Sequence, residues 1–287
     1  MPYAEARYVR EKGCLPGTRE SLLREICDIL NDPSEDAPRV CLLTGVAGLG
    51  KSAVAHSIAR LYDAQKRLAS SYCFASTDVK RRNPRNLFST IARDLCDHDL
   101  QYKSALWGIV KDNRALRTST SPLEQLEQFI VEPNRGLDSV GPQLVVIIDA
   151  IDESGDRPNR RELLAAISKQ IVENALPTNL RFLITARPES DILDTFSSNS
   201  HFVHKQMGDI PEGIVEGDIK RFIHHSLHRY GELELIWPNG EWCQLLVRSI
   251  YSSGLPPHAS LFKKSESTHA TNLICFCTEM TKALLDL

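Results

Sequence analysis

Gly45-Val46-Ala47-Gly48-Leu49-Gly50-Lys51-Ser52 is the stretch of sequence from which the fold can be argued. It matches the pattern G-x-x-x-x-G-K-[S/T] at every fixed position. Glycines in such a loop permit backbone dihedral angles that turn successive N–H groups inward around an anion. A helix beginning at Gly50-Lys51 would direct its positive dipole end and its free N–H groups at the same anion. The stretch therefore predicts a loop that wraps phosphate groups.

The residue types in this loop narrow the prediction to a nucleoside triphosphate with Mg²⁺. Lys51 is expected to reach the β- and γ-phosphate oxygens, and the Ser52 hydroxyl is expected to bind the metal ion. The alternative interpretation is a glycine-rich turn with a solvated lysine, which leaves the complete match unexplained. The predicted nucleotide-binding residues are Gly45, Val46, Ala47, Gly48, Leu49, Gly50, Lys51, Ser52 and Ala53.

Strand-like and helical runs alternate on both sides of this loop. The predicted strands are residues 39–44, 69–76, 144–148 and 180–185, with a short edge strand at 201–206; the predicted helices are residues 18–30, 51–65, 83–97 and 160–174, and residues 100–135 are helical in two pieces. This alternation predicts the α/β class: a P-loop NTPase fold with a parallel sheet, helices on both faces and a small helical region after it.

The same patterns divide the chain into four predicted segments. Residues 1–37 form a lead-in segment with one helix, and residues 38–210 form the NTPase core. Residues 211–251 show helical periodicity only. Residues 252–287 are rich in Ser, Pro, His and Thr without a clear period, and we interpret them as a disordered or truncated end.

An acidic cluster follows the most apolar strand of the chain, Leu144-Val145-Val146-Ile147-Ile148-Asp149-Ala150-Ile151-Asp152-Glu153. In open α/β sheets ligands bind at the carboxyl ends of the strands. Asp149 is therefore predicted to hold Mg²⁺ through its water shell, together with Ser52. Asp152 or Glu153 would orient the attacking water, and Glu153 is our first choice between them.

Arg187 follows another predicted strand, in Phe182-Leu183-Ile184-Thr185-Ala186-Arg187-Pro188. An arginine at this place can contact the γ-phosphate and report its presence to neighbouring elements. The alternative is an ordinary surface arginine at a strand end. We group Arg187 with Asp152 and Glu153 as a candidate catalytic residue.

The composition limits the classes of partner. The net charge of −3 provides no electrostatic reason to expect nucleic acid or an acidic membrane as the main partner. No apolar run approaches the roughly 20 residues that span a bilayer. The eight cysteines form no Cys-x-x-Cys pair and suit a reducing compartment, so a cytoplasmic protein is expected.

These motifs taken together resemble those of the NACHT domain, which belongs to the STAND class of P-loop ATPases. The similarity covers about residues 13–250 and is greatest to fungal NOD-like proteins with a nephrocystin-3-like N-terminal NTPase region. The segment Gly13-Cys14-Leu15-Pro16-Gly17-Thr18-Arg19 resembles the stretch before the NTPase core of those proteins. Gly254-Leu255-Pro256 resembles a Gly-x-Pro motif that touches adenine in related proteins.

The resemblance implies an ATP/ADP switch with slow Mg²⁺-dependent hydrolysis and NOD-like signalling. It implies that Asp149 holds Mg²⁺, that Asp152 and Glu153 support hydrolysis and that Arg187 is a sensor arginine. It also implies nucleotide-dependent self-association, and the effector and sensor partners stay open. Two alternatives remain: a nucleotide-binding fragment or degraded paralogue without turnover, and another P-loop enzyme such as a kinase or helicase.

Overall fold

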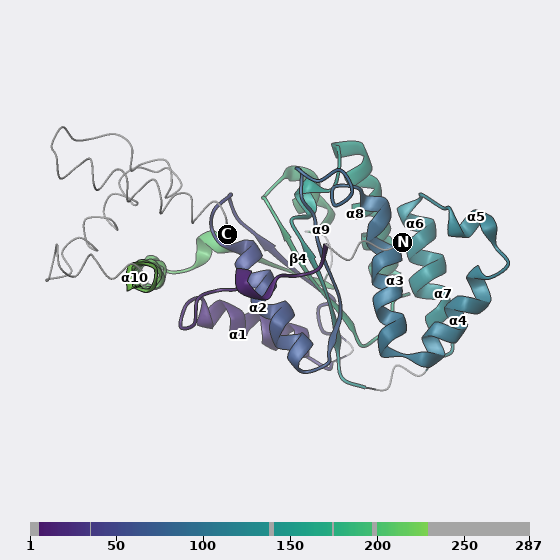
Figure 1. Cartoon of the computed structure of the whole chain (residues 1–287), viewed down its shortest axis with the longest axis horizontal. Coiled ribbons are helices and arrows are strands. Elements are labelled where there is room, and N and C mark those ends of the chain that lie inside the picture. Colours follow the sequence, from purple (N-terminus) through teal and green to yellow (C-terminus); the bar gives the residue numbers. More distant parts are fainter. Residues whose placement is uncertain (1–5, 35, 138–140, 174, 197–199, 229–287) are drawn as a thin grey trace, which may run out of the picture. The chain divides into compact units, whose positions relative to one another are not determined.

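The computed structural model describes residues 6–34, 36–137, 141–173, 175–196 and 200–228 of the 287-residue chain (Figure 1). Its five strands are β1 (Val40–Thr44), β2 (Leu68–Cys73), β3 (Leu144–Asp149), β4 (Leu180–Ala186) and β5 (Phe202–Gln206). They form one sheet in the order β2-β3-β4-β1-β5. Every neighbouring pair is parallel, so the predicted parallel α/β fold is confirmed.

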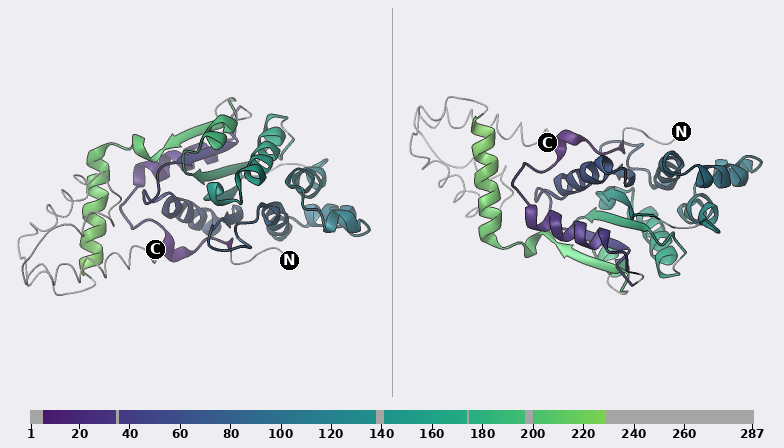
Figure 2. Two further views of the ribbon diagram at one scale, coloured as in Figure 1. Left: turned by 90° about the horizontal axis from the view of Figure 1, so that it is seen from above. Right: turned by 90° about the horizontal axis from the view of Figure 1, so that it is seen from below.

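The described residues form ten α-helices; helices of the unit that contains the sheet cover both of its faces (Figures 1 and 2), and α10 belongs to a separate compact unit. The ten helices are α1 (Glu20–Asn31), α2 (Lys51–Ala64), α3 (Leu87–His98), α4 (Leu100–Val110), α5 (Arg114–Arg117), α6 (Pro122–Leu126), α7 (Glu132–Asn134), α8 (Arg157–Val172), α9 (Ser190–Phe196) and α10 (Glu212–His228). Short helical turns occur at η2 (Arg10–Lys12), η3 (Pro84–Asn86), η4 (Glu127–Val131), η5 (Ile151–Glu153) and η6 (Met207–Asp209).

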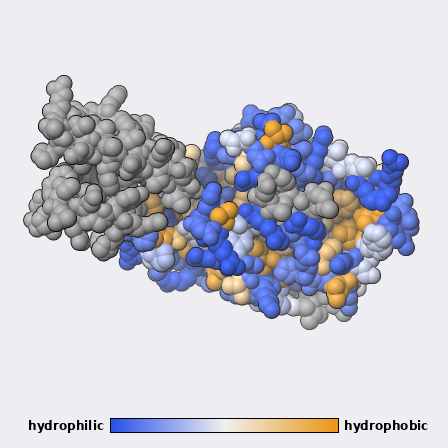
Figure 3. All heavy atoms as spheres, viewed as in Figure 1, coloured by the Kyte–Doolittle hydropathy of each residue, from blue (hydrophilic) through white to orange (hydrophobic). Residues whose placement is uncertain are grey.

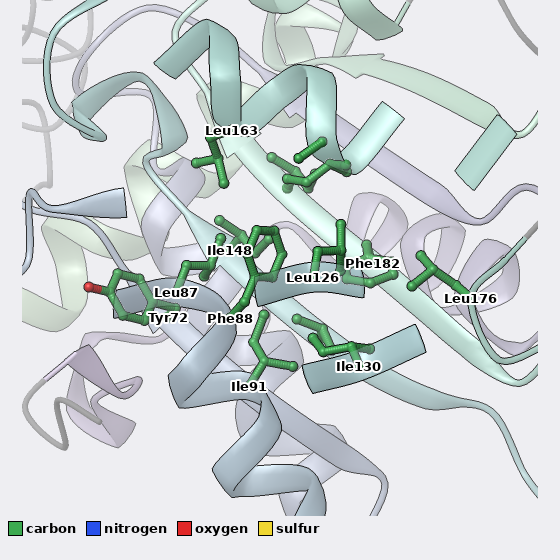
Figure 4. Close-up of a cluster of buried hydrophobic side chains, with 14 of the residues drawn as sticks. Tyr72, Leu87, Phe88, Ile91, Leu126, Ile130, Ile148, Leu163, Leu176 and Phe182 are labelled. Atoms are coloured by element: carbon green, nitrogen blue, oxygen red, sulfur yellow. The ribbon is translucent and has the colours of Figure 1, made fainter. Parts of the chain in front are cut away.

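The largest part of the core lies on one face of the sheet (Figure 4). Here Ile148 and Phe182 of the sheet pack with Phe88 of α3, Leu126 of α6 and Leu163 of α8, all buried. Residues at alternate strand positions, including Cys41, Leu43, Ile147 and Leu183, are buried as well. Since successive side chains of a strand point to opposite faces, both faces of the sheet must be covered.

Two predicted helical regions differ in detail from the structure. The helix expected at residues 160–174 begins at Arg157, because the Asp156 side chain accepts a hydrogen bond from the Asn159 N–H and Pro158 occupies the first turn. Residues 100–135 form α4, α5, α6, η4 and α7 instead of two pieces. Asn113 and Ser121 each cap a new helix there, and η4 is a π-helical turn.

The chain divides into two compact units. One unit consists of Met1–Cys14 with Ser21–Asp209, and the other of Leu15–Glu20 with Ile210–Leu287. Within the second unit, the Arg19 backbone N–H donates to Asp218 at 3.0 Å and the Arg221 guanidinium donates to the Gly17 carbonyl. The predicted helical stretch after residue 228, the Gly254-Leu255-Pro256 motif and the segment 252–287 lie outside the described residues.

On the face shown in Figure 3, the described residues are mostly hydrophilic, with hydrophobic side chains scattered between them. Among the described residues, no helix has both the length and the apolar character required to cross a membrane.

Candidate functional site

The predicted phosphate loop connects β1, which ends at Thr44, to α2, which begins at Lys51. Gly48 and Gly50 have φ angles of 84° and 87°, which lie in the left-handed region that side chains disfavour. Gly45 is required for a different reason, because a Cβ atom there would lie 2.8 Å from the Met207 Cβ atom. The glycines thus give this loop its shape through both dihedral angle and close packing.

The N-terminus of α2 has the features of an anion site. No side chain caps this 14-residue helix at Gly50. Its first N–H groups and the positive end of its dipole therefore remain available to a ligand at the loop. Val46, Ala47 and Gly48 are exposed, so a phosphate group can approach from solvent. The loop therefore fits the phosphate groups that the sequence predicts for it.

The Lys51 side chain folds back over the loop that precedes it. Its Nζ atom donates to the carbonyl oxygens of Gly45 at 2.7 Å and Val46 at 3.1 Å. Burial lowers the pKa of Lys51, whereas the charges of Asp152, Asp149 and Glu153 oppose that shift. The structure thus brings Lys51 and the acidic cluster into one site.

Asp149 ends β3, and its carboxylate is anchored by the neighbouring strand β4. Its Oδ1 atom accepts a hydrogen bond from the Thr185 Oγ1 atom at 2.5 Å, and the Ala150 N–H donates to the same hydroxyl at 2.9 Å. Ala150 has a φ angle of 56°, which turns the chain sharply after the strand. Thr185 fixes one Asp149 oxygen, and the other oxygen is left for a different partner.

Arg187 holds both acids of the turn η5. Its backbone N–H donates to Asp152 Oδ1 at 3.1 Å, and its guanidinium lies 3.3 Å from Asp152 Oδ2 and 3.2 Å from Glu153 Oε1. The second Glu153 oxygen accepts from the Ser76 N–H at 2.6 Å. Burial raises the pKa of the Asp152 carboxyl, and Arg187 partly offsets this effect.

The structure adds Arg160 of α8, which the sequence reasoning did not select. Its Nη1 atom donates to the Asp152 carbonyl at 2.8 Å, and its Nε atom donates to Asp191 at 3.0 Å. Its Nη2 atom also contacts Glu189 at 2.5 Å. A buried arginine must have hydrogen-bond acceptors. The sequence shows neither that Arg160 is buried nor which acceptors it has, so no local pattern identifies this residue.

The strand order explains why these residues share a site. Since β4 lies between β1 and β3, its carboxyl end carries Thr185 and Arg187 between the phosphate loop and the acidic turn. Oxygen donors of the kind that Mg²⁺ prefers are present in the exposed Ser52 hydroxyl and the Asp149 carboxylate. The residue types at this edge of the sheet therefore fit a nucleotide with Mg²⁺.

Comparisons with solved structures give similar proteins at low sequence identity. The Walker-type ATPase PABY2304 of Pyrococcus abyssi has 14% identity and a TM-score of 0.42, covering 93% of this chain and 75% of that protein. The Aeropyrum pernix ORC1 protein, determined in complex with DNA, has 16% identity and a TM-score of 0.42, covering 91% and 65%. PCH-2 of C. elegans has 15% identity and a TM-score of 0.39, covering 100% and 74%.

Sequence comparisons place the chain in a family. No curated protein matches it significantly. The family model described as "Nephrocystin 3, N-terminal" matches residues 17–187, which include the phosphate loop, the acidic turn and Arg187. This match covers more than half of the 287 residues. The chain therefore belongs to the nephrocystin 3 N-terminal family.

Proposed function

We propose that the chain is a NACHT-type switch of the STAND class that binds ATP or ADP with Mg²⁺ and hydrolyses ATP slowly. The observation that carries this proposal is the convergence of Lys51 at the start of α2 with Asp149 at the end of β3 and Arg187 after β4. The sequence resemblance to NACHT domains of NOD-like proteins supplies the switch and signalling part of the proposal.

The phosphate groups are held by the loop and by the start of α2. Backbone N–H groups around Gly48 and Gly50 surround the phosphates, and the Lys51 ammonium exchanges its two carbonyl partners for phosphate oxygens. Ser52 and Asp149 would hold Mg²⁺, which supplies positive charge against the triphosphate. Thr185 keeps the Asp149 carboxylate in one orientation by its hydrogen bond to Oδ1.

We assign different roles to the two acids of η5. Both acids have partners on both carboxylate oxygens, so exposure is what distinguishes them, and the Asp152 side chain is only 3% exposed. The Glu153 side chain is 23% exposed, so it can contact a water molecule. Glu153 therefore orients the attacking water, and Asp152 positions Arg187.

Arg187 connects the nucleotide state to the rest of the chain. Its guanidinium is shared between Asp152 and Glu153 and is 51% exposed, so it can turn towards a γ-phosphate. A γ-phosphate would compete with the two carboxylates for this cation. ATP and ADP would then leave Arg187 with different partners, which is the local event that a switch requires. Nucleotide-dependent self-association and effector binding are the outputs that the resemblance implies.

Titration of the purified chain with ATP, ADP and GTP in Mg²⁺ tests the binding part of this proposal. We expect adenine nucleotides to bind and Lys51→Ala to weaken them by about 10- to 100-fold, because a charge-assisted hydrogen bond contributes ~1.5–3 kcal/mol. Lys103→Ala, which removes the same charge from an exposed site on α4, should leave binding unchanged. A folded chain that binds none of the three nucleotides would refute the proposal.

Hydrolysis is tested separately with Glu153→Gln. We expect this variant to bind ATP with Mg²⁺ as well as the unchanged chain does and to lose turnover by about 10²-fold or more. Turnover that survives in Glu153→Gln and disappears in Asp152→Asn would reverse the assignment of the two acids. Binding without turnover in the unchanged chain would favour the alternative of a nucleotide-binding fragment or degraded paralogue.

A further inference from the structure

A buried group of three side chains with different metal-binding atoms lies beside the nucleotide site. It consists of His56 on α2, Cys73 at the end of β2 and Asp149 at the end of β3. Their nitrogen, sulfur and oxygen ligand atoms all lie within 4.8 Å of one another. Cys73 and Asp149 are direct partners in the parallel register of β2 and β3, so the sheet itself holds them together.

We propose that His56, Cys73 and Asp149 bind Zn²⁺ or a similar thiophilic divalent cation. An imidazole, a thiolate and a carboxylate together form a typical zinc ligand set, and three protein ligands leave a fourth position for water. Tetrahedral zinc separates its ligand atoms by about 3.3–3.8 Å, so even the largest separation within the 4.8 Å limit needs to shorten by only about 1 Å. As the sulfur–metal bond forms, the Cys73 thiol releases its proton to solvent.

The Asp149 and Cys73 side chains are suited to this role by their present contacts. Thr185 occupies only one oxygen of Asp149, which leaves the second oxygen for a metal. Cys73 is buried at the end of β2, directly opposite Asp149 in the strand register, so its sulfur lies beside that carboxylate. Arg81 donates to the Cys73 carbonyl at 3.2 Å, which holds the backbone at the end of β2 in place.

His56 links the metal to the N-terminal segment, residues 6–14. The Val9 backbone N–H donates to the His56 Nδ1 atom at 3.2 Å. If Nδ1 binds the metal, its lone pair is used; if Nε2 binds the metal, Nδ1 must carry the proton. In either case Nδ1 no longer accepts from Val9. Metal binding and this contact of the N-terminal segment are therefore mutually exclusive.

Release of the segment would also remove a charge that opposes a cation. Lys12 belongs to residues 6–14, and its positive charge acts on both His56 and Cys73. The remaining anchors of the segment on α2 and β2 include the hydrogen bonds of Tyr8 to Ser71 and Cys14 to Ser57. Loss of the Val9 contact and repulsion of Lys12 by the metal both act to loosen the segment.

Titration with Co²⁺, a spectroscopic substitute for Zn²⁺, tests the site without nucleotide. We expect a cobalt–thiolate absorption band that one equivalent of Zn²⁺ abolishes. Because other cysteines and histidines occur in the chain, the decisive comparison is between variants. Cys73→Ser and His56→Gln should remove or shift the band, whereas Cys41→Ser, a buried cysteine of β1 outside the cluster, should retain it. A band unchanged in folded Cys73→Ser would overturn the proposal.

A second measurement uses the unchanged chain and so does not depend on the folding of any variant. Trypsin should cleave after Arg10 and Lys12 several-fold faster when Zn²⁺ is present, because the segment is released. Mg²⁺ at the same concentration, which lacks affinity for thiolate, should not produce this effect. Equal cleavage rates with and without Zn²⁺ would overturn the link to the N-terminal segment.

If Asp149 also holds Mg²⁺, Zn²⁺ at the cluster should weaken ATP binding in the unchanged chain, and much less so in Cys73→Ser. This expectation rests on the proposed function. If Co²⁺ binds at the cluster but ATP does not bind at all, the metal site stands and the proposed function fails. If ATP binds and no cobalt–thiolate band forms, the proposed function stands and the metal site fails.

Discussion

At residue 45 the end of β1 passes so close to Met207 that a Cβ atom would meet the Met207 Cβ and Cγ atoms at 2.8 and 3.1 Å. Gly45→Ala should therefore destabilise the chain by ~1–3 kcal/mol, because added volume in a packed site forces the surrounding backbone to move. Gly208→Ala is the matched control beside Met207, since a Cβ atom there meets nothing within 4 Å. Urea unfolding of both variants measures the difference.

The difference in stability between the two variants distinguishes close packing at Gly45 from a need for backbone flexibility there. If Gly45 is needed only for flexibility, the two alanine variants should behave alike, with small effects in the range of ~0.4–1 kcal/mol. A selective loss in Gly45→Ala would show that η6 presses against the phosphate loop. In that case Met207 belongs to the scaffold of the site, a role that no motif in the sequence indicates.

Asp152 makes a second prediction at this scale, concerning pH. Burial raises the pKa of its carboxyl above the ordinary value of 3.8, whereas Arg187 lowers it. Protonation of Asp152 therefore occurs at a higher pH than in an exposed aspartate and releases its ion pair with Arg187. Turnover should fall on the acidic side as pH decreases through this raised pKa. Arg187→Gln should move that acidic limb to higher pH, because it removes the opposing positive charge.

The same raised pKa determines how Asp152 affects folding. The native chain binds the Asp152 proton more tightly than the unfolded chain does, so this group's contribution to stability is fully present below pH 3.8. That contribution is lost as pH rises through the native pKa.

The turnover prediction for Arg187→Gln is checked by measuring kcat for ATP hydrolysis against pH, with Arg157→Gln as a charge-matched control. An acidic limb that moves to lower pH in Arg187→Gln would contradict the prediction.

At the scale of elements, α8 is tied to the functional site by Arg160. Its side chain is 6% exposed and pairs with Asp191, whose side chain is 3% exposed, while also holding the Asp152 carbonyl. Arg160→Met should cost ~3–5 kcal/mol, because it leaves the Asp191 charge buried without its main partner. Arg157→Met, one turn earlier on α8, should cost ~0–1 kcal/mol, since that side chain is 55% exposed.

Denaturant unfolding of the two variants measures this contrast, and nucleotide binding reports the functional part. Because Arg160 connects α8, η5 and the start of α9, its loss should also disturb the turn that carries Asp152 and Glu153. Equal stability losses in the two variants would mean that the buried ion pair contributes no more than an exposed one.

The elements also show how far the sequence predicts this fold. Apolar runs and helical periods located all five strands and most helices, because periodicity depends on local burial. The order β2-β3-β4-β1-β5 was not predicted, since periodicity identifies a strand but not its neighbour. The prediction of two helical pieces for residues 100–135 is too simple, because the breaks between helices depend on single capping side chains, Asn113 and Ser121.

The functional site also has one part that the sequence predicted and another part that it did not. Residues of the phosphate loop are consecutive, so the motif alone predicted their grouping. The contact of Thr185 with Asp149 joins two strands, and that of Arg187 with Glu153 joins the segments that follow these strands. Both contacts depend on the pairing of β3 with β4. His56 and Cys73 meet for a similar reason, because α2 and β2 bring them to the end of β3. Local sequence patterns contain no information about such contacts.

At the scale of the whole molecule, the candidate site is confined to one compact unit. The phosphate loop, the acidic turn, Arg187 and the cluster of His56, Cys73 and Asp149 all lie in the unit formed by Met1–Cys14 and Ser21–Asp209. The described part of the other unit is Leu15–Glu20 with residues 210–228, and the Gly254-Leu255-Pro256 stretch, which resembles an adenine-contacting motif, lies beyond the described residues. The contribution of each unit to nucleotide affinity can therefore be measured separately.

A chain that ends at Asp209 separates those shares. We expect it to bind ADP with Mg²⁺ with a Kd within about tenfold of the full chain, a difference of ~1.4 kcal/mol, because the loop N–H groups, Lys51 and Asp149 are all retained. Lys51→Ala should weaken binding in the shortened chain as it does in the full chain. Titration of both chains, with circular dichroism to confirm folding, measures this. A loss of more than about 100-fold in a folded shortened chain would place a main part of the nucleotide site beyond residue 209, where an adenine contact from Gly254-Leu255-Pro256 would then account for it.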